Sequence, residues 1–398
     1  MSTCDFNEDA AVARLMRFLA VEGVTGHEKA IAEEIIAALT EAGIPRGVIH
    51  FDDANTRIPF PTQTGNLIVN LPGTAPGPRL MLSTHMDTVP LCAGAKPKRV
   101  GKRIVAEGAT ALGGDNRTGV GVLVTLAATL VERKLPHPPL TLLFTVREES
   151  GLWGARHVDR ALLGEPVMCF NVDGRRADQI TIGAVGADRW EVEIVGKAAH
   201  AGVYPEQGIS ATAVAALALA EVHKAGWFGK IKRKDGAGTS NVGPFGGKNG
   251  SCAGDATNVV TDYVHIKGES RSHSTAFIGK ITGAYRTAFK KAAGHVRDHK
   301  GHSAKVQFEA RRDYFPFRLK ESAPVVQRAL EAAKSTGLAP ETRISNGGLD
   351  ANWLVRNGLP AITFGAGQNG IHAIGEYVEI ADYLAGCRLA LALSMQSR

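Results

Sequence analysis

Short apolar runs alternate with stretches of helical periodicity in the first half of the chain. The runs at 66–70 (NLIVN), 79–83 (RLMLS), 140–146 (LTLLFTV) and 167–172 have the length and composition of buried strands. Two helices are expected over 9–42, separated by the turn at 23–26, and another over 117–132. Strands that alternate with helices favour a mostly parallel, mixed sheet flanked by helices, an α/β fold.

The pattern changes after residue 184. Segments 189–195, 259–268 and 305–311 alternate apolar and polar residues like half-exposed antiparallel strands, and helices are expected over 209–225 and 277–293. Beyond 316 the α/β pattern returns, with a helix at 323–336, a strand at 360–364 and a last helix from 380. We therefore predict a catalytic domain formed by 1–183 and 316–398, with a smaller α+β lid domain, 184–315, inserted into it.

The charge and the cysteines restrict the class of protein. The net charge is +7, and basic clusters stand at 96–103 (KPKRVGKR) and 230–234 (KIKRK). Neither cluster is interleaved with aromatic residues or accompanied by a nucleic-acid-binding motif, so we interpret both as solvated loops and expect no nucleic-acid partner.

No apolar run reaches the roughly 20 residues that span a bilayer, and the N-terminus lacks a secretory pattern. Five scattered cysteines without a CxxC pair favour reduced thiols. A cytoplasmic protein without a membrane partner is expected.

Five polar segments stand where an α/β sheet normally builds its site, after predicted strands or in glycine-rich turns. They are 83–87 (STHMD), 112–116 (LGGDN), 147–151 (REESG), 171–174 (NVDG) and 370–373 (GIHA). His85 and Asp87 would share one face if the strand continued that far. Each segment alone has an ordinary explanation: a surface histidine, a helix N-cap, or a solvated loop for Glu148 and Glu149. Their joint occurrence in one scaffold favours a metal site.

The order His-x-Asp, Asp, Glu-Glu, Asp, His resembles that of the di-zinc metallopeptidases, which include peptidase T, carboxypeptidase G and the aminoacylases. The resemblance covers nearly the whole chain. Four segments look most like the peptidase T branch: 110–120 (TALGGDNRTGV), 269–273 (ESRSH), 346–354 (NGGLDANWL) and 365–376 (GAGQNGIHAIGE).

This resemblance implies two Zn²⁺ ions per subunit, with Co²⁺ or Mn²⁺ as substitutes. Asp115 would bridge the ions, with His85 and Asp173 completing one site and Glu149 and His372 the other. Asp87 would orient His85, and Glu148 would be the general base. A cis peptide is expected between Asp115 and Asn116. Asn116 and Arg117 depart from the family, which commonly has Asp and Lys there.

The resemblance also implies contacts from the lid domain. His200, in a KAAHAG segment, would contact the scissile group, and Asn258 and Arg271 would bind the substrate main chain or carboxylate. An exposed loop histidine and a structural salt bridge are the alternatives. Whether His200 acts within its own subunit or across a homodimer formed through the lid stays open.

The predicted function is a zinc peptidase for short peptides, most simply an aminopeptidase that releases the N-terminal residue of a tripeptide. Two zinc ions lower the pKa of a shared water towards about 7, and Glu148 would pass its proton to the leaving amine. A carboxypeptidase, a dipeptidase or an N-acyl-amino-acid deacylase is the alternative on the same site. A non-catalytic peptide-binding member is more remote, because a binder has no need of Glu148. No P-loop or GxSxG motif supports nucleotide binding or serine chemistry.

Overall fold

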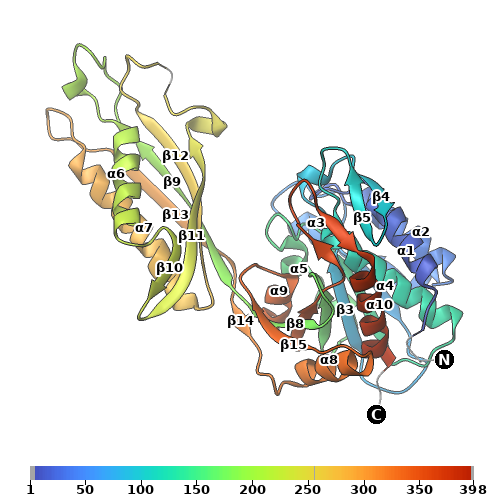
Figure 1. The fold of residues 1–398 in the computed structure, drawn as a ribbon. Helices are drawn as coiled ribbons and strands as arrows, with labels where there is room; N and C mark the ends of the chain where they lie inside the picture. Colours follow the sequence, from blue (N-terminus) through green and yellow to red (C-terminus); the bar gives the residue numbers. More distant parts are fainter. Residues whose placement is uncertain (1–4, 255, 396–398) are drawn as a thin grey trace. The chain divides into compact units, whose positions relative to one another are not determined.

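The computed structural model describes residues 5–254 and 256–395. The chain forms two units (Figure 1). Unit 1 comprises Met1–Ala184 and Arg318–Arg398, and unit 2 comprises Val185–Phe317. Each unit has its own cluster of buried apolar side chains.

The centre of unit 1 is a nine-stranded mixed sheet. Its strand order is β1 (Ile49–Phe51), β2 (Leu67–Leu71), β6 (Leu140–Thr145), β3 (Leu80–His85), β7 (Cys169–Val172), β16 (Ala361–Phe364), β8 (Gln179–Ala184) and β14 (Phe317–Arg318), with β15 (Glu341–Ser345) also pairing with β8. The four neighbours β6, β3, β7 and β16 are parallel and buried throughout, as strands covered on both faces must be. The predicted α/β fold class is confirmed.

Helices cover both faces of this sheet. The long helix α4 (Gly114–Glu132) packs along β3, and α1 (Glu8–Leu19), α2 (Lys29–Glu41) and α10 (Ile380–Met395) pack against α4. On the same face, α8 (Pro324–Ser335) packs against α10 and contacts β7 and β16, whereas α9 (Asp350–Arg356) contacts these two strands from the other face. Two short helices, α3 (Ala54–Arg57) and α5 (Trp153–His157), complete the unit. Nearly all of α4 is buried, which places its first turn deep in unit 1.

A second, four-stranded sheet in unit 1 corrects one prediction. It contains β4 (Lys96–Val100), β5 (Arg103–Glu107), β18 (Tyr377–Glu379) and β17 (Gln368–Asn369). The basic cluster at 96–103, which we expected to be a solvated loop, is a β-hairpin instead. All but one of the residues of β4 are exposed, so the strand lacks the apolar alternation from which a strand is predicted.

Unit 2 is an α+β structure with a five-stranded antiparallel sheet. The order is β10 (Gly229–Arg233), β11 (Gly236–Gly246), β12 (Tyr263–Ser272), β9 (Gly186–Val195) and β13 (Lys305–Tyr314). Trp190, Val192 and Ile194 point to a buried face that packs with α6 (Ala211–Lys224) and α7 (Thr275–His295). The three predicted strands are present, although β12 begins at Tyr263 rather than at 259.

The hairpin of β10 and β11 was not predicted. It includes the basic cluster at 230–234 and a glycine-rich segment, and glycine is a poor sign of a strand. Packing explains the glycine at Gly236, because a Cβ there would lie 2.4 Å from the ring of Phe277.

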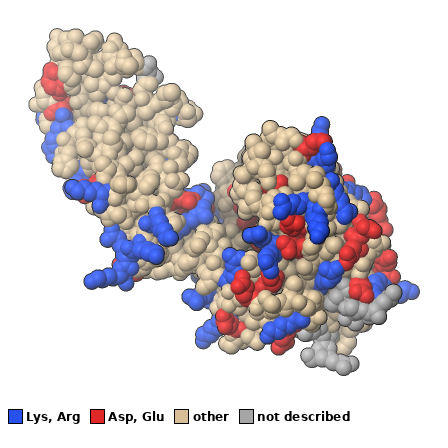
Figure 2. All heavy atoms as spheres, in the orientation of Figure 1, with Lys and Arg blue, Asp and Glu red and all other residues tan. Residues whose placement is uncertain are grey.

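The surface of unit 1 carries charges of both signs. On the face drawn in Figure 2, lysine and arginine side chains are interspersed with aspartate and glutamate, so neither sign dominates that face. Within the described part of the chain, no helix combines the length and the apolar character needed to cross a membrane.

Candidate active site

The carboxyl ends of neighbouring parallel strands meet at one edge of the unit 1 sheet. His85 is the last residue of β3, Glu148 follows β6, and Asp173 directly follows β7. Since β3 lies between β6 and β7, these three side chains come from adjacent strand ends, although they are far apart in the sequence. Ligands bind at this edge in α/β sheets.

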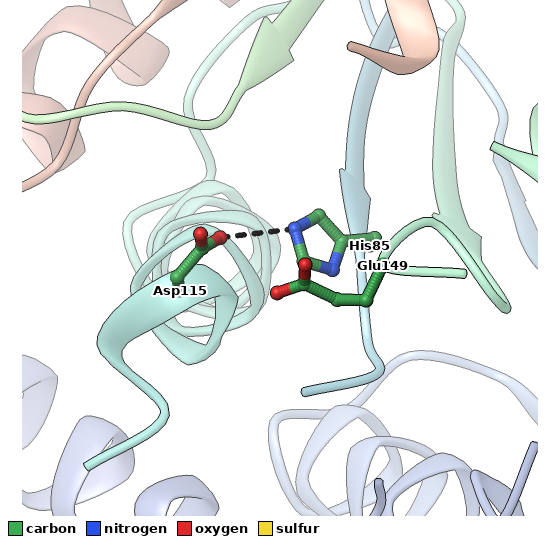
Figure 3. A group of neighbouring side chains, drawn as sticks. All are labelled: His85, Asp115 and Glu149. Carbon is green, nitrogen blue, oxygen red and sulfur yellow. Dashed lines mark hydrogen bonds and ion pairs between the residues drawn. The ribbon is translucent and has the colours of Figure 1, made fainter. Parts of the chain in front are cut away.

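Asp115 lies between two imidazoles. Its Oδ1 is 3.1 Å from Nε2 of His85, and its Oδ2 is 3.2 Å from Nε2 of His372. Figure 3 shows the carboxylate of Asp115 facing the His85 ring, with Glu149 beside that ring. Ligand atoms of His85, Asp115 and Glu149 all lie within 4.8 Å of one another. One carboxylate that presents a different oxygen to each of two imidazoles has the geometry of a bridging ligand.

The remaining candidates surround this pair of contacts. Nε2 of His372 also lies 3.0 Å from Glu149, and Oδ1 of Asp173 accepts a hydrogen bond from Gln368 at 3.1 Å. His372 has a left-handed backbone with φ of 62°. The structure thus brings Asp115 into contact with His85 and His372, and His372 into contact with Glu149, while Asp173 lies at the end of the neighbouring strand β7.

Several carboxyl groups lie close together in this buried region, and their pKa values are shifted as a result. Burial raises the pKa of Glu148 well above its usual range. Burial and then the charge of Asp115 raise the pKa of Glu149 to about 7 and that of Asp173 to about 6. Hydrogen bonds to Asp115 and Glu149 raise the pKa of His372 to about 10. Such a cluster prefers added positive charge, which a divalent cation supplies. Nitrogen and oxygen donors of this kind suit Zn²⁺, Co²⁺ or Mn²⁺.

Asp87 connects the end of β3 to the turn after β6. Its Oδ1 lies 3.3 Å from Nδ1 of His85, and its two carboxylate oxygens accept the backbone N–H groups of Glu148 (3.0 Å) and Glu149 (3.2 Å). β3 ends at His85, so the condition under which Asp87 and His85 would share a strand face is not met. Asp87 instead reaches the imidazole from the following loop and is fully buried.

Glu376 is a site residue that the sequence did not single out. Its carboxylate accepts backbone N–H groups of Leu112 (2.9 Å), Gly113 (2.8 Å) and Asp115 (3.0 Å). It therefore fixes the turn that presents Asp115. Glu376 stands at the end of the GAGQNGIHAIGE segment, so its place near His372 was the available signal.

The structure also shows the peptide bond after Asp115 and the contacts of Asn116 and Arg117, the two residues that depart from the family. The Asp115–Asn116 peptide is cis, which confirms that prediction. Asn116 donates from Nδ2 to the carbonyl of Val172 at 2.6 Å, a bond that an ionised aspartate could not form. Arg117 donates to the carbonyl of Met86. Both side chains thus hold the backbone next to proposed ligands.

Two further buried carboxylates were missed. Oε1 of Glu28 accepts the N–H of Arg147 at 3.1 Å, and Asp350 accepts the hydroxyl of Thr145. Burial is the first cause that raises the pKa of each to about 7. Asp350 lies in the NGGLDANWL segment, whereas Glu28 stands in a helical pattern that gave no signal.

The other three candidates lie in unit 2. Nδ1 of His200 accepts the N–H groups of Gly202 (3.2 Å) and Val203 (3.1 Å), so in the neutral ring the proton is on Nε2. The carbonyl of Asn258 accepts the N–H of Ala201 at 2.8 Å, which places Asn258 beside His200. Arg271, on β12, donates from Nη2 to Glu269 at 2.9 Å, an ion pair of the kind that the sequence left as its alternative role.

Comparisons with known proteins agree over almost the whole chain. The model of peptidase family M20/M25/M40 matches residues 81–396. The uncharacterised protein YqjE of Bacillus subtilis (strain 168) is 29% identical over 388 residues, which is 97% of this chain and 98% of that protein. Peptidase T of Escherichia coli (strain K12) is 23% identical and covers 80% of this chain and 82% of its own.

Two solved structures have the same fold. A tripeptidase from Staphylococcus aureus subsp. aureus Mu50 has a TM-score of 0.86 with 27% identity, and 98% of each chain is covered. Aminopeptidase PepT from Bacillus cereus ATCC 10987 has a TM-score of 0.81 with 29% identity, again over 98% of each chain. Because the family model spans most of the sequence and these relatives match it nearly from end to end, the chain belongs to peptidase family M20/M25/M40 and is a peptidase.

Proposed function

We propose that this peptidase is a two-metal aminopeptidase that releases the N-terminal residue from short peptides, above all tripeptides. The observation that carries the proposal is the position of Asp115, whose two oxygens face two imidazoles 3.1 and 3.2 Å away. The similarity to a tripeptidase and to an aminopeptidase supports the substrate class and the direction of cleavage.

The proposed ligand set consists of two imidazoles and three of the carboxylates at this edge of the sheet. His85 and Asp173 would hold one ion, Glu149 and His372 the other, and Asp115 would bridge them. The nitrogen and oxygen donors support Zn²⁺ as the natural metal, with Co²⁺ or Mn²⁺ as substitutes.

Glu148 is the proposed general base. When bound, the metals would polarise the scissile carbonyl and lower the pKa of a water molecule. Glu148 would accept the proton of that water and return it to the leaving amine. Its place in the turn after β6, directly next to the proposed ligand Glu149, supports this role. The bond from its backbone N–H to Asp87 keeps the turn in place.

His200, Asn258 and Arg271 are the proposed contacts from unit 2. In its neutral form His200 presents an Nε2–H group, a suitable donor for the developing oxyanion. Arg271 uses only part of its five N–H donors on Glu269, which leaves others for a peptide carboxylate. The open edge strands β10 and β13 support a homodimer formed through unit 2. Four unpaired cysteines, Cys92, Cys169, Cys252 and Cys387, support a cytoplasmic location.

The test uses one tripeptide with three different residues, such as Leu-Gly-Phe, in free, N-acetylated and C-amidated forms. The protein is treated with a chelator and then supplied with Zn²⁺, Co²⁺ or Mn²⁺, and the products are identified by mass spectrometry. We expect release of leucine from the free and amidated peptides, no cleavage of the acetylated one, and activity only with metal. Preferred cleavage of the acetylated peptide would favour a deacylase, and release of phenylalanine first a carboxypeptidase. Full activity after complete metal removal would refute the two-metal mechanism.

A further inference from the structure

A small pocket lies beside Asp173 in unit 1. Its volume is about 250 Å³, and its walls come from the turn after β7, from β8 and β15, and from the loop before α9. Clefts that take whole drug-sized ligands measure roughly 300–1,000 Å³. This pocket therefore fits a single side chain better than a complete peptide.

Three arginines are among the residues that line this pocket: Arg175, Arg176 and Arg343. Arg176 is already neutralised, because its Nε donates to Asp178 at 2.9 Å. Arg343 donates to the uncharged side chain of Gln179. Among the residues that the structure describes, the guanidinium of Arg175 has no hydrogen-bond or ion-pair partner.

The balance of charge in the pocket is positive. Its one carboxylate lining residue is Asp173, which the proposed function assigns to a metal ion. Once Asp173 is committed to a cation, no carboxylate of the pocket lining is left for Arg175 or Arg343, and the nearby acid Asp382, which the charge of Arg175 reaches, is not a lining residue. Arginine is well suited to hold a carboxylate through paired, charge-assisted hydrogen bonds.

The turn that carries Arg175 is held firmly by its backbone. Gly365, Ala366 and Gly367 donate their N–H groups to the carbonyls of residues 176, 174 and 175 at 3.0, 2.9 and 2.7 Å. A glycine is required at Gly365, because a Cβ there would lie 2.3 Å from the backbone nitrogen of Arg176. The backbone from which Arg175 and Arg176 extend is therefore held in place by these hydrogen bonds.

We infer that this pocket binds the acidic side chain of a residue next to the scissile bond, so that the enzyme prefers short peptides with Glu or Asp at that position. The inference rests on the proposed function, since Asp173 places the pocket wall next to the metal on which the scissile carbonyl would lie. It adds a substrate class, peptides with an anionic side chain, to the proposed reaction.

The experiment compares isosteric peptides on the metal-loaded enzyme. The pairs are Glu-Ala-Ala with Gln-Ala-Ala, and Ala-Glu-Ala with Ala-Gln-Ala. At one of the two positions we expect kcat/KM to be about 10- to 100-fold higher for Glu than for Gln, the range of a hydrogen bond to a charged group. The preference should appear mainly in KM and should weaken as salt is added.

Substitutions then locate the preference. In R175Q/R343Q the Glu-to-Gln ratio should fall to about one, and R175Q alone, at an exposed position, should lower it part of the way. R160Q removes another exposed arginine of unit 1 that does not line the pocket, and should keep the ratio of the unchanged protein. Metal content and circular dichroism check that each variant is folded.

Two results would overturn the inference: equal kcat/KM for Glu and Gln at both positions, or a preference that survives in R175Q/R343Q. If no tripeptide is cleaved at all, the proposed function fails, and calorimetric binding of the same peptides decides the pocket. Tighter binding of the Glu peptide, lost in R175Q/R343Q, would still support it, and equal binding would refute it.

Discussion

Glu148 and Glu149 are neighbours in the sequence with different surroundings. The carboxylate of Glu149 lies 3.0 Å from Nε2 of His372, within the group of ligand atoms that also includes Asp115. Among the described residues no imidazole forms an ion pair with Glu148, and burial raises the pKa of this carboxyl. These different surroundings agree with the roles that we propose, Glu149 as a metal ligand and Glu148 as the general base.

Replacing Glu148 by Gln tests that division. The amide keeps the size of the side chain but cannot accept the proton of water, so we expect kcat to fall by about 10²- to 10⁴-fold. Metal content, measured by atomic emission, should stay at two ions per chain. The matched variant Glu149→Gln should instead lose metal. If E148Q also lost its metal, Glu148 would be a ligand or a structural residue.

The proposed metal ligands could be predicted from the sequence, whereas the buried carboxylates that hold the surrounding backbone could not. His85, Asp115 and Glu149 stand in short motifs whose order resembles a known family, so their proximity followed from the sequence. Glu28 and Glu376 accept backbone N–H groups, which every residue except proline provides. The residue type of the partner therefore gives no sign of such a bond. Asp87 lies beside His85 as expected, but it does so from the loop after β3 and not from a shared strand face.

At the scale of single elements, the first turn of α4 depends on a distant strand. Glu376 precedes β18 and accepts three backbone N–H groups from 112–115, so the position of Asp115 is set from the other end of the chain. The carboxylate of Glu376 is buried, and its charge strengthens each of these bonds.

Replacing Glu376 by Gln should therefore weaken metal binding without removing any ligand. The amide of glutamine offers one oxygen in place of two and would lose at least one of these bonds. Changes in groups that orient ligands typically cost 10- to 100-fold in metal affinity, and we expect a loss of about that size. Competition with a chromophoric chelator measures it. Glu379→Gln, at the other end of β18 and paired with Arg103 on the surface, is the control and should bind metal normally. Unchanged affinity in E376Q would show that the turn holds itself.

Strands were predictable where burial was complete. β3, β6 and β7 are buried along their whole length, and apolar residues therefore make up most of their sequences. The hairpins β4–β5 and β10–β11 were missed because their residues are mostly exposed or glycine, and neither feature produces an apolar pattern. The sequence thus predicts the fully buried strands, but it misses these two hairpins and also β8, a partly buried strand of the central sheet.

At the scale of the whole molecule, every proposed ligand belongs to unit 1, while unit 2 has a separate core. A ligand stabilises only the folded structure that binds it, by roughly 4 kcal/mol at a thousand times its Kd. Metal binding should therefore protect unit 1 from unfolding and leave the intrinsic stability of unit 2 unchanged.

Tryptophan fluorescence can follow the two units separately. Trp153 and Trp353 lie in unit 1, and Trp190 and Trp227 in unit 2. In W190F/W227F, chelation should lower the melting temperature by several degrees. In W153F/W353F, which reports on unit 2, it should change little. Equal shifts in both variants would mean that the units unfold together.

The strands that begin and end unit 2 are neighbours in its sheet. β9 starts the unit, β13 ends it, and Ala187 is paired directly with Tyr314. Paired residues of antiparallel strands have Cα atoms only about 4.5–5.5 Å apart. Because the two ends of unit 2 lie so close together, unit 1 can accommodate the insertion with a gap of only a few ångströms between the residues that flank it. Evolution could therefore have gained, exchanged or enlarged this module as one piece, and an engineer could transplant it in the same way.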